Sequence, residues 1–314
     1  MTCRRDGLFR LSPHIPGMGG FSMRLNPHLL LWVFGLTVAC KAPEPTGNAL
    51  LVVDDAGDTT RLAAPARRIV SLIPATTEML FALGAGNQVA GRTTWDDYPP
   101  EASRVPSVGD GISPNLEAVL GRQPDLVVMY RSASNSAAAA RFQKLGIPVL
   151  QLAVDRLADV PRVLGLLGTM TGHEREADSV SAVFRAELAE VTITDTAGRP
   201  SVFILAWDQP PMTIGAGSFL SEVVERAGGH NAYADLPGPS AQISIESVVK
   251  RNPDVVLIST ENLPAFSRRP EWQTVPAVRD RRFVRVENSA FSRPSPRAPD
   301  AIRILSHLLR DSLP

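Results

Sequence analysis

A stretch of twelve residues occurs twice in this chain, and this repeat restricts the folds that the chain can adopt. Residues 117–128 read EAVLGRQPDLVV and residues 246–257 read ESVVKRNPDVVL, so that Glu, Val, Arg, Pro and Asp recur at identical offsets. Each copy predicts a short amphipathic helix ended by proline, followed by an apolar strand buried in a parallel sheet. Because the copies lie far apart in the sequence, we expect two similar α/β lobes in one molecule.

The segments around the repeat extend this α/β pattern. Thr76, Thr77 and Glu78 suit the first turn of a helix that follows the first strand, and Ser113 should cap the helix that carries Glu117. A β-hairpin should precede the first lobe. One bridging helix should join the lobes, and whether it breaks near Gly172 is left open. The predicted bounds are 1–40 for a signal region, 41–66 for a tether and hairpin, 67–156 for the first lobe, 157–192 for the bridging helix and 193–314 for the second lobe.

Residues 1–40 contain a segment with the features of a secretory signal. The apolar stretch 29–39 is too short for a membrane-spanning helix, which needs about 20 apolar residues. It ends in Val-Ala-Cys, which resembles a bacterial lipobox and would make Cys40 the lipidated first residue of a membrane-anchored lipoprotein. Thr37 stands where that pattern usually has leucine, so secretion as an unanchored periplasmic protein is the alternative. The alternative start residues are Met1, Met18 and Met23.

Composition and motifs argue against several function classes. Outside residues 1–40 the chain carries 28 basic and 31 acidic residues without a basic stripe, so we expect no nucleic-acid partner. Residues 84–89 begin like a dinucleotide-binding fingerprint, but they follow a predicted helix and lack the third glycine. No cysteine follows Cys40, and His173, His230 and His307 lack the spacing of metal ligands. We therefore expect no enzymatic activity, no bound metal and no cofactor.

Aromatic residues and arginines gather where predicted strands end. In open α/β sheets, ligands bind beyond the carboxyl ends of the strands, so these loops should face one another across a cleft between the lobes. Each aromatic side chain alone could equally be a packed loop residue, and their shared placement is what favours a ligand site. The predicted ligand-binding residues are Trp95, Tyr98, Tyr130, Arg131, Trp207, Met212, Phe291, Arg293 and Arg297.

Several segments resemble the iron and cobalamin class of substrate-binding proteins of ABC importers, and its corrinoid-binding branch in particular. The resemblance runs in unbroken order from about Ala49 to the C-terminus. It implies a class III periplasmic binding protein, an α/β fold with two Rossmann-like lobes joined by a single long backbone helix. It also implies capture and handover of a metal chelate without covalent chemistry. The similar segments are 69–78, 95–100, 115–120, 123–127, 145–149, 209–215 and 295–297.

The same resemblance gives the repeated glutamates a role. In that family an exposed glutamate on each lobe docks into arginine pockets of the two permease subunits, and Glu117 and Glu246 match those positions. Charge complementarity of this kind fixes orientation and speeds association. The alternative is a pair of solvated glutamates favoured by the positive end of a helix dipole. The implied partners are the permease dimer of an ABC importer and a small metal chelate. The protein itself is expected to be a monomer, in contact with the membrane only through a lipid anchor.

The resemblance favours a cobalamin-type corrinoid as the ligand. Such a macrocycle has no strong net charge, so its site should be aromatic and shallow, and Trp95 and Tyr130 match aromatic positions of the corrinoid-binding branch. Three positions depart from that branch. Gly111 and Ser240 stand where tryptophans are expected, and Ser289 stands where an aspartate would contact the corrinoid.

These departures keep haem and ferric siderophores as alternative ligands. Haem would need an axial ligand such as Tyr98 or Tyr130, and arginines for its propionates, which Arg131, Arg293 and Arg297 could supply. An anionic siderophore complex would also bind the arginines. An extracytoplasmic enzyme and a ligand sensor that meets no permease are more distant alternatives.

Overall fold

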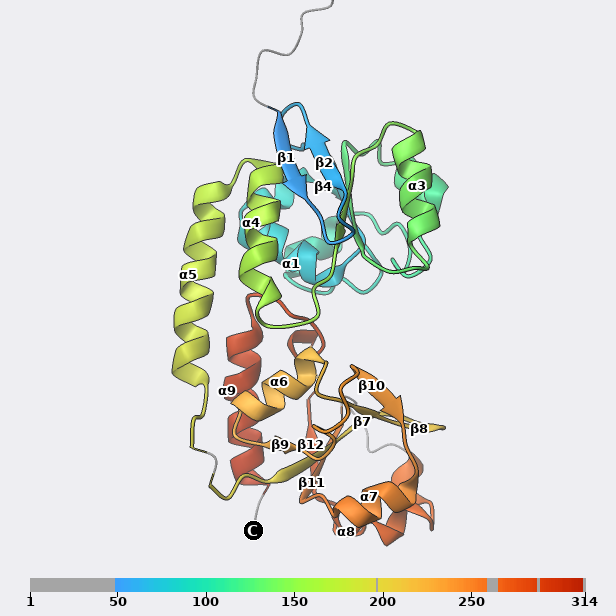
Figure 1. The fold of residues 1–314 in the computed structure, drawn as a ribbon, viewed down its shortest axis with the longest axis vertical. Coiled ribbons are helices and arrows are strands. Elements are labelled where there is room, and N and C mark those ends of the chain that lie inside the picture. The colour runs from blue at the N-terminus through green and yellow to red at the C-terminus, as the bar shows by residue number, and fades with distance from the viewer. Residues whose placement is uncertain (1–48, 196, 259–264, 287–288, 313–314) are drawn as a thin grey trace, which may run out of the picture. The chain divides into compact units, whose positions relative to one another are not determined.

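The computed structural model describes residues 49–195, 197–258, 265–286 and 289–312. These residues form two α/β lobes, drawn mainly in blue and green and in yellow to red in Figure 1. The predictions for the signal region, for Cys40 and for the start of the tether fall on residues outside the described ranges. Within those ranges, no helix has the length and apolar character needed to cross a membrane.

The first lobe combines a β-hairpin with a parallel sheet. Its elements are β1 (Leu50–Val53), β2 (Thr59–Leu62), β3 (Ile69–Ser71), α1 (Pro74–Ala82), β4 (Val89–Gly91), α2 (Leu116–Leu120), β5 (Leu126–Tyr130), α3 (Ser136–Lys144) and β6 (Val149–Leu152). The sheet has the strand order β4-β3-β5-β6, with every pair parallel. The predicted hairpin β1–β2 is present, and Thr60 attaches it to the sheet by donating its hydroxyl to the carbonyl oxygen of Val149 at 2.6 Å.

The second lobe is built on a mixed sheet. Its elements are β7 (Ser201–Asp208), β8 (Pro211–Ile214), α6 (Phe219–Arg226), β9 (His230–Asn231), β10 (Ser240–Gln242), α7 (Ile245–Arg251), β11 (Val255–Ile258), α8 (Pro276–Arg279), β12 (Phe283–Arg285) and α9 (Ala298–Asp311). The strand order is β10-β8-β7-β11-β12, with β9 beside β7. Strands β7, β11 and β12 are parallel, and β8 and β10 are antiparallel additions. Trp207 and Met212, which we predicted in a loop, instead pair across the β7–β8 hairpin.

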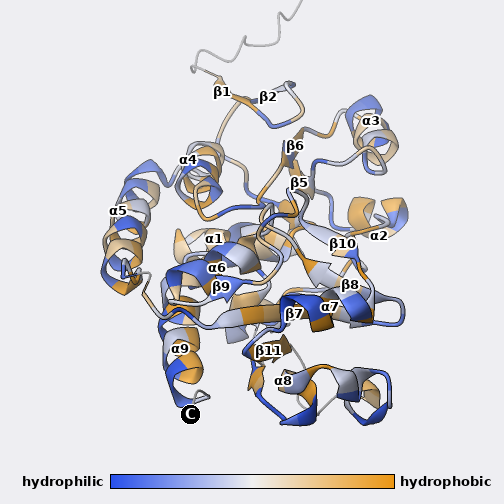
Figure 2. Cartoon of the chain, turned by 60° about the horizontal axis from the view of Figure 1, so that its bottom comes forward, coloured by the Kyte–Doolittle hydropathy of each residue, from blue (hydrophilic) through white to orange (hydrophobic). Residues whose placement is uncertain are grey.

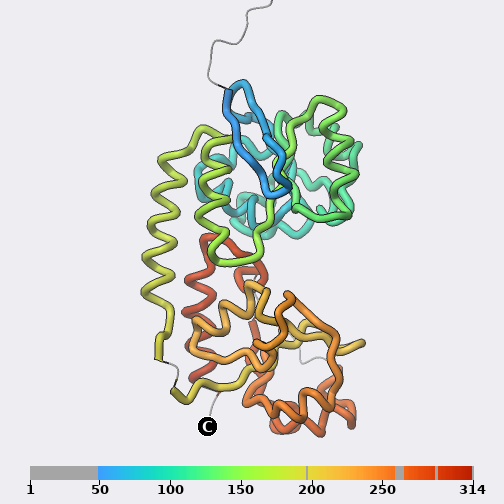
Figure 3. The backbone as a smooth tube through the Cα atoms, in the orientation of Figure 1, coloured from blue at the N-terminus to red at the C-terminus, as the bar shows by residue number. Residues whose placement is uncertain are grey.

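Two helices, rather than one, follow β6 in the chain and precede β7. They are α4 (Asp159–Thr171) and α5 (Glu174–Val191), and they pack side by side (Figure 3). Gly172 separates them with φ 75°, in the left-handed region that ends a helix. The prediction of one bridging helix over 157–192 is therefore wrong in its bounds. The chain reverses after α4, and α5 alone is the long helix that leads into the second lobe.

The two copies of the repeated stretch adopt the same structure. Each forms a helix, α2 or α7, followed by a buried strand, β5 or β11. The residue before the proline has a positive φ in both copies, 50° at Gln123 and 43° at Asn252. The helix caps also correspond, because Asn115 and Ser244 each accept a hydrogen bond from the amide three residues later. The cap of α2 is thus Asn115 and not the predicted Ser113.

The aspartate of each copy ties the repeat to the strand beside it. Asp125 accepts hydrogen bonds from the backbone amides of Arg67 and Arg68 at 2.8 and 2.9 Å. Asp254 accepts one from the amide of Ser201 at 2.7 Å. The Pro-Asp pair therefore has a structural role in both lobes. The repeated glutamates take no part in it.

Apolar packing continues from one lobe into the other. A single hydrophobic cluster includes buried residues of both lobes, such as Leu80 in α1, Leu164 in α4 and Ile302 in α9. Helix α9 packs against α5 and α6, and it has one hydrophobic and one hydrophilic side (Figure 2). Because burial of apolar surface is the main stabilising term in folding, this shared cluster fixes the two lobes to each other.

Candidate functional site

Charged and aromatic side chains from the two lobes meet beside helix α1. The first lobe contributes Glu78 from α1 and the loop 93–99 that follows β4. The second lobe contributes the segment 289–297 between β12 and α9. We call the following residues the inter-lobe cluster: Glu78, Asp97, Tyr98, Ser289, Arg293 and Arg297.

Glu78 lies at the centre of this cluster, with a side chain that is only 2% exposed. Arg297 donates to both carboxylate oxygens, from Nε to Oε2 at 2.9 Å and from Nη2 to Oε1 at 2.5 Å. Arg293 donates from Nη1 to Oε1 at 3.1 Å. The expectation that Glu78 stabilises the first turn of a helix is wrong, because α1 begins at Pro74 and the carboxylate is bound by the second lobe. A buried carboxylate requires such partners, since an unpaired buried charge is costly.

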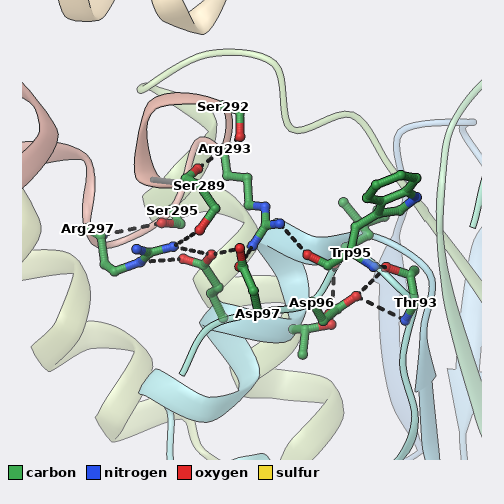
Figure 4. A network of polar contacts seen from close by, with 12 residues as sticks. Thr93, Trp95, Asp96, Asp97, Ser289, Ser292, Arg293, Ser295 and Arg297 are labelled. Atoms are coloured by element: carbon green, nitrogen blue, oxygen red, sulfur yellow. Dashed lines mark hydrogen bonds and ion pairs between the residues drawn. The ribbon is translucent and has the colours of Figure 1, made fainter. Parts of the chain in front are cut away.

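Arg293 also binds the loop that follows β4 (Figure 4). Its guanidinium contacts the carboxylate of Asp97 and the backbone oxygen of Trp95. Burial by itself raises the pKa of Asp97, but hydrogen bonds from Arg293 and Ser289 and the charge of Arg293 outweigh it. The pKa of Asp97 therefore lies below its usual value, and the carboxyl is ionised at neutral pH.

Two more contacts hold Arg297. Its guanidinium carbon lies 3.8 Å from the centre of the Tyr98 ring, a cation–π arrangement. Its Nη2 donates to the hydroxyl of Ser289 at 3.0 Å. Ser289, which replaces an expected aspartate, thus supports an arginine.

Two cavities of about 470 and 480 Å³ border the cluster. The first is lined by residues from both lobes, including Phe81, Tyr98, Glu101, Pro296 and Arg297. The second is lined by residues including Asp97, Phe219, Phe291, Ser292 and Arg293. Because the cluster forms part of both walls, a molecule in either cavity would touch it.

The loop that carries Trp95 and Asp97 is fixed by Asp96, whose side chain points away from the cluster. Its Oδ2 accepts hydrogen bonds from the amide of Thr93, at 2.9 Å, and from the Thr93 hydroxyl (Figure 4). Burial raises the pKa of Asp96, and hydrogen bonds offset this only in part. The loop is therefore held from both sides, by Asp96 within its own lobe and by Arg293 from the other.

Gly111 shows why a tryptophan is not accommodated near this loop. Its φ is +79°, and a Cβ atom built on it would lie 2.6 Å from the carbonyl oxygen of Leu72. A side chain at this backbone position would therefore collide with the end of β3. A tryptophan at residue 111, as expected in the corrinoid-binding branch, would therefore require a different backbone conformation at this position.

Each lobe also presents an exposed indole. Trp95 is 59% exposed and Trp207 is 61% exposed. Trp207 lies on the β7–β8 hairpin, where its Nε1 donates to the backbone oxygen of Gln209 at 2.7 Å. Met212 pairs with it and is half-buried. Indoles in such positions offer large, rigid apolar faces to a ligand.

Tyr130 is the last residue of β5 and Arg131 follows it, and both lie outside the inter-lobe cluster. The Tyr130 hydroxyl donates to Oδ1 of Asp155 at 2.7 Å. Burial, followed by the hydrogen bond and negative charge of Asp155, raises the pKa of Tyr130 to about 12. Tyr130 is thus a neutral phenol at physiological pH. Arg131 is exposed.

The remaining site predictions fall in different surroundings. Phe291 is 3% exposed and belongs to the shared hydrophobic core, so it reaches the second cavity only as part of its wall. Sequence reasoning missed Glu78 and Asp97 as site residues. The signal for Asp97 was its place between Trp95 and Tyr98, and that for Glu78 was its position just beyond the end of β3.

Glu117 and Glu246 are both exposed, in the first turns of α2 and α7. The pKa of Glu246 is lowered by a hydrogen bond from its own backbone amide and by one from Ser244. Neither glutamate forms an ion pair with another residue in the part of the chain that the structure describes. Among the described residues, no three His, Cys, Asp or Glu side chains converge as a metal site would require.

The sequence profile of a periplasmic binding protein family matches residues 69–290. The chain belongs to this family. Among curated relatives, it is 31% identical over 242 residues to the vitamin B12-binding protein of Pectobacterium carotovorum subsp. carotovorum strain PC1, covering 76% of this chain and 86% of that protein. It is 32% identical over 279 residues to the uncharacterized ABC transporter substrate-binding lipoprotein YvrC of Bacillus subtilis strain 168, covering 85% and 87%.

A solved structure has the same fold. The periplasmic heme-binding protein RhuT from Roseiflexus sp. RS-1, in its apo form, superposes with a TM-score of 0.71 at 26% identity, covering 79% of this chain and 99% of that one. The predicted class III arrangement, two α/β lobes with a backbone helix, is therefore confirmed. This periplasmic binding protein acts outside the cytoplasm, and its family is one of binding proteins.

Proposed function

We propose that this periplasmic binding protein captures a cobalamin-type corrinoid between its lobes and delivers it to an ABC importer. The observation that carries the proposal is the charge balance of the inter-lobe cluster, where two arginines are paired with two carboxylates. A corrinoid without strong net charge needs aromatic and apolar contact more than free cations. Similarity to the vitamin B12-binding protein of Pectobacterium carotovorum supports the same ligand.

In this proposal, indole rings supply most of the contact area. Trp95 from the first lobe and Trp207 from the second are both more exposed than Tyr98, which is 40% exposed. Tyr98, Met212 and Phe291 would add smaller apolar surfaces, whereas Arg293 and Arg297 would act mainly by joining the lobes. Tyr130 and Arg131 would lie at the edge of the site.

Haem is the second candidate ligand, because the heme-binding protein RhuT shares this fold at 26% identity. Two observations disfavour it. Both candidate axial ligands are already engaged, because the Tyr130 hydroxyl donates to Asp155 and the Tyr98 ring stacks on Arg297. Two of the three arginines expected to bind its propionates, Arg293 and Arg297, already bind Glu78, which leaves Arg131. The second argument applies equally to an anionic ferric siderophore.

For delivery, Glu117 and Glu246 would dock onto basic pockets of a two-subunit permease. Both are exposed, occupy equivalent positions in the two lobes and take no part in the structural role of the repeat. The similarity to an ABC transporter substrate-binding lipoprotein supports an importer as the partner. We further propose that the protein works as a monomer without cofactor or enzymatic activity, anchored through lipidated Cys40.

The ligand can be tested by titrating the purified protein with cyanocobalamin, haemin and a ferric hydroxamate while following tryptophan fluorescence. Free N-acetyltryptophanamide corrects for light absorbed by the ligands. We expect saturable quenching by cyanocobalamin at submicromolar concentration. Trp95→Phe and Trp207→Phe should remove most of it, because Trp272 is fully buried in the second lobe. Saturable quenching by haemin or the hydroxamate alone would overturn the corrinoid assignment.

A further inference from the structure

We propose that Glu78 is a specificity-determining residue that excludes anionic chelates from the cleft. Its single carboxylate binds the guanidinium groups of Arg293 and Arg297, so that neither arginine of the cluster is free to bind an anionic ligand. The inference rests on the proposed function, in that it takes the space around the inter-lobe cluster as the ligand site. It adds a mechanism by which one protein of this fold selects between neutral and anionic ligands.

The burial and geometry of the ion pairs make it difficult for a ligand to displace Glu78 from the two arginines. The side chains of Arg293 and Arg297 are only 12% and 18% exposed, and that of Glu78 is 2% exposed. Arg297 binds Glu78 through a bidentate contact, the strongest form of guanidinium–carboxylate recognition. An incoming carboxylate would have to displace Glu78, which would then remain buried without its partners, and such a loss is strongly unfavourable.

The charges on the cavity walls also disfavour anionic ligands. Three carboxylates, of Glu78, Glu101 and Asp300, line the first cavity beside the single guanidinium of Arg297. Asp300 is partly neutralised by Arg303, at 2.6 Å. These walls carry more negative than positive charge and would repel an anion at short range.

In the second cavity, Asp97 accompanies Arg293. The Asp97 side chain is 61% exposed and therefore presents its ionised oxygens to solvent and to any ligand there. Both cavities thus offer an anion no unpaired guanidinium from the cluster. A neutral macrocycle meets no such penalty, because it need not compete for the arginines.

The experiment compares ligands that differ in charge on one macrocycle. The probes are cyanocobalamin and its monocarboxylic acid, in which one side-chain amide has been hydrolysed to a carboxylate. For the native protein we expect affinity for the monocarboxylic acid to be about tenfold lower. Glu78→Gln keeps the shape and leaves one guanidinium charge uncompensated, so the difference should shrink to about threefold or less.

A second substitution separates charge from structure. The variant Glu78→Gln/Arg297→Gln restores the charge balance while still lacking the native ion pair. If charge is the determinant, the preference for the neutral ligand should return in this double variant. If Glu78 acts only by holding the lobes together, the double variant should resemble Glu78→Gln or be worse, which would overturn the proposal.

Asp97→Asn keeps the inference testable if substitution of buried Glu78 prevents folding. Asp97 is largely exposed, so its loss should leave the fold intact and improve relative binding of the anion by about two- to fivefold. An unchanged affinity ratio in Asp97→Asn, and in Glu78→Gln if it folds, would overturn the proposal.

Haemin separates this inference from the proposed function. If the native protein binds no corrinoid, the proposed ligand is wrong, and the inference is then decided by haemin, which carries two propionate carboxylates. Its affinity should rise at least tenfold in Glu78→Gln and severalfold in Asp97→Asn relative to the native protein. No rise in either variant would reject Glu78 as a determinant of charge selection, whatever the natural ligand is.

Discussion

At the scale of single residues, burial and the hydrogen bond to Asp155 together make Tyr130 harder to ionise. Burial and the Asp155 carboxylate raise the pKa of Tyr130 to about 12, above its usual value of 10. Asp155→Asn removes the negative charge and should lower this pKa, but not fully to 10, because burial remains the larger cause. Ultraviolet titration of tyrosinate absorbance measures the change, with Tyr130→Phe identifying the signal. An unaltered titration in Asp155→Asn would contradict the assigned contact.

The same pKa has a consequence for stability at high pH. The folded protein keeps the Tyr130 proton more tightly than the unfolded chain does, so the stabilisation is complete below about pH 10. It should be lost as the pH rises from about 10 to about 12. Tyr130→Phe should lack this component of the decline, which chemical denaturation at several pH values can detect.

How far single residues could be predicted depended on the range of their contacts. The aromatic and basic residues after the predicted strands formed a recognisable pattern in the sequence. The structure brings Tyr98, Arg293 and Arg297 together around the carboxylates of Glu78 and Asp97. Glu78 was not predicted as a site residue, because its partners are more than 200 residues away and local chemistry suggested a helix terminus. Phe291 looked like a loop aromatic because burial by a distant core leaves no local signal.

At the scale of elements, the repeated aspartates should differ in energetic weight. Asp125 accepts two backbone amides and Asp254 accepts one. In Asp125→Asn one amide would face an NH₂ group and lose its acceptor. Because the contact is exposed and water can replace the acceptor, the cost should be about 0.5–1.5 kcal/mol in the free energy of unfolding. Asp254→Asn can turn its oxygen to the single amide and should cost less. Equal or reversed losses in urea unfolding would contradict this account of the repeat.

Elements were predictable where the pattern was local. The β1–β2 hairpin and both helix–Pro-Asp–strand units occur where periodicity and turn residues placed them. The bridging segment was misjudged because α4 and α5 share helical periodicity, and Gly172 alone marks the reversal. The β7–β8 hairpin was missed because prolines in its turn resemble a loop.

At the scale of the whole molecule, delivery and ligand capture should be separable. Charge reversal at Glu117 and Glu246 should abolish uptake through the importer, because both lobes lose the complementary charge. Ligand affinity should stay within about twofold, since these side chains are exposed on the repeat helices and not part of the cluster. Growth on limiting corrinoid and equilibrium dialysis measure the two effects.

Glu176→Lys is the matched control for that experiment. Glu176 is likewise an exposed glutamate in the first turn of a helix, α5, but lies outside the repeat. Uptake should be normal in this variant. Normal uptake with both Glu117 and Glu246 reversed would reject the docking proposal and leave them as solvated residues favoured by the helix dipole.

Selection of a corrinoid over an anionic chelate can be measured by a competition experiment. The purified protein is mixed with equal concentrations of cyanocobalamin and haemin and passed through gel filtration, and the visible spectrum of the protein fraction is recorded. We predict the absorption bands of cyanocobalamin in one-to-one proportion to protein. A protein fraction that carries the Soret band of haem, with no corrinoid bands, would contradict the account.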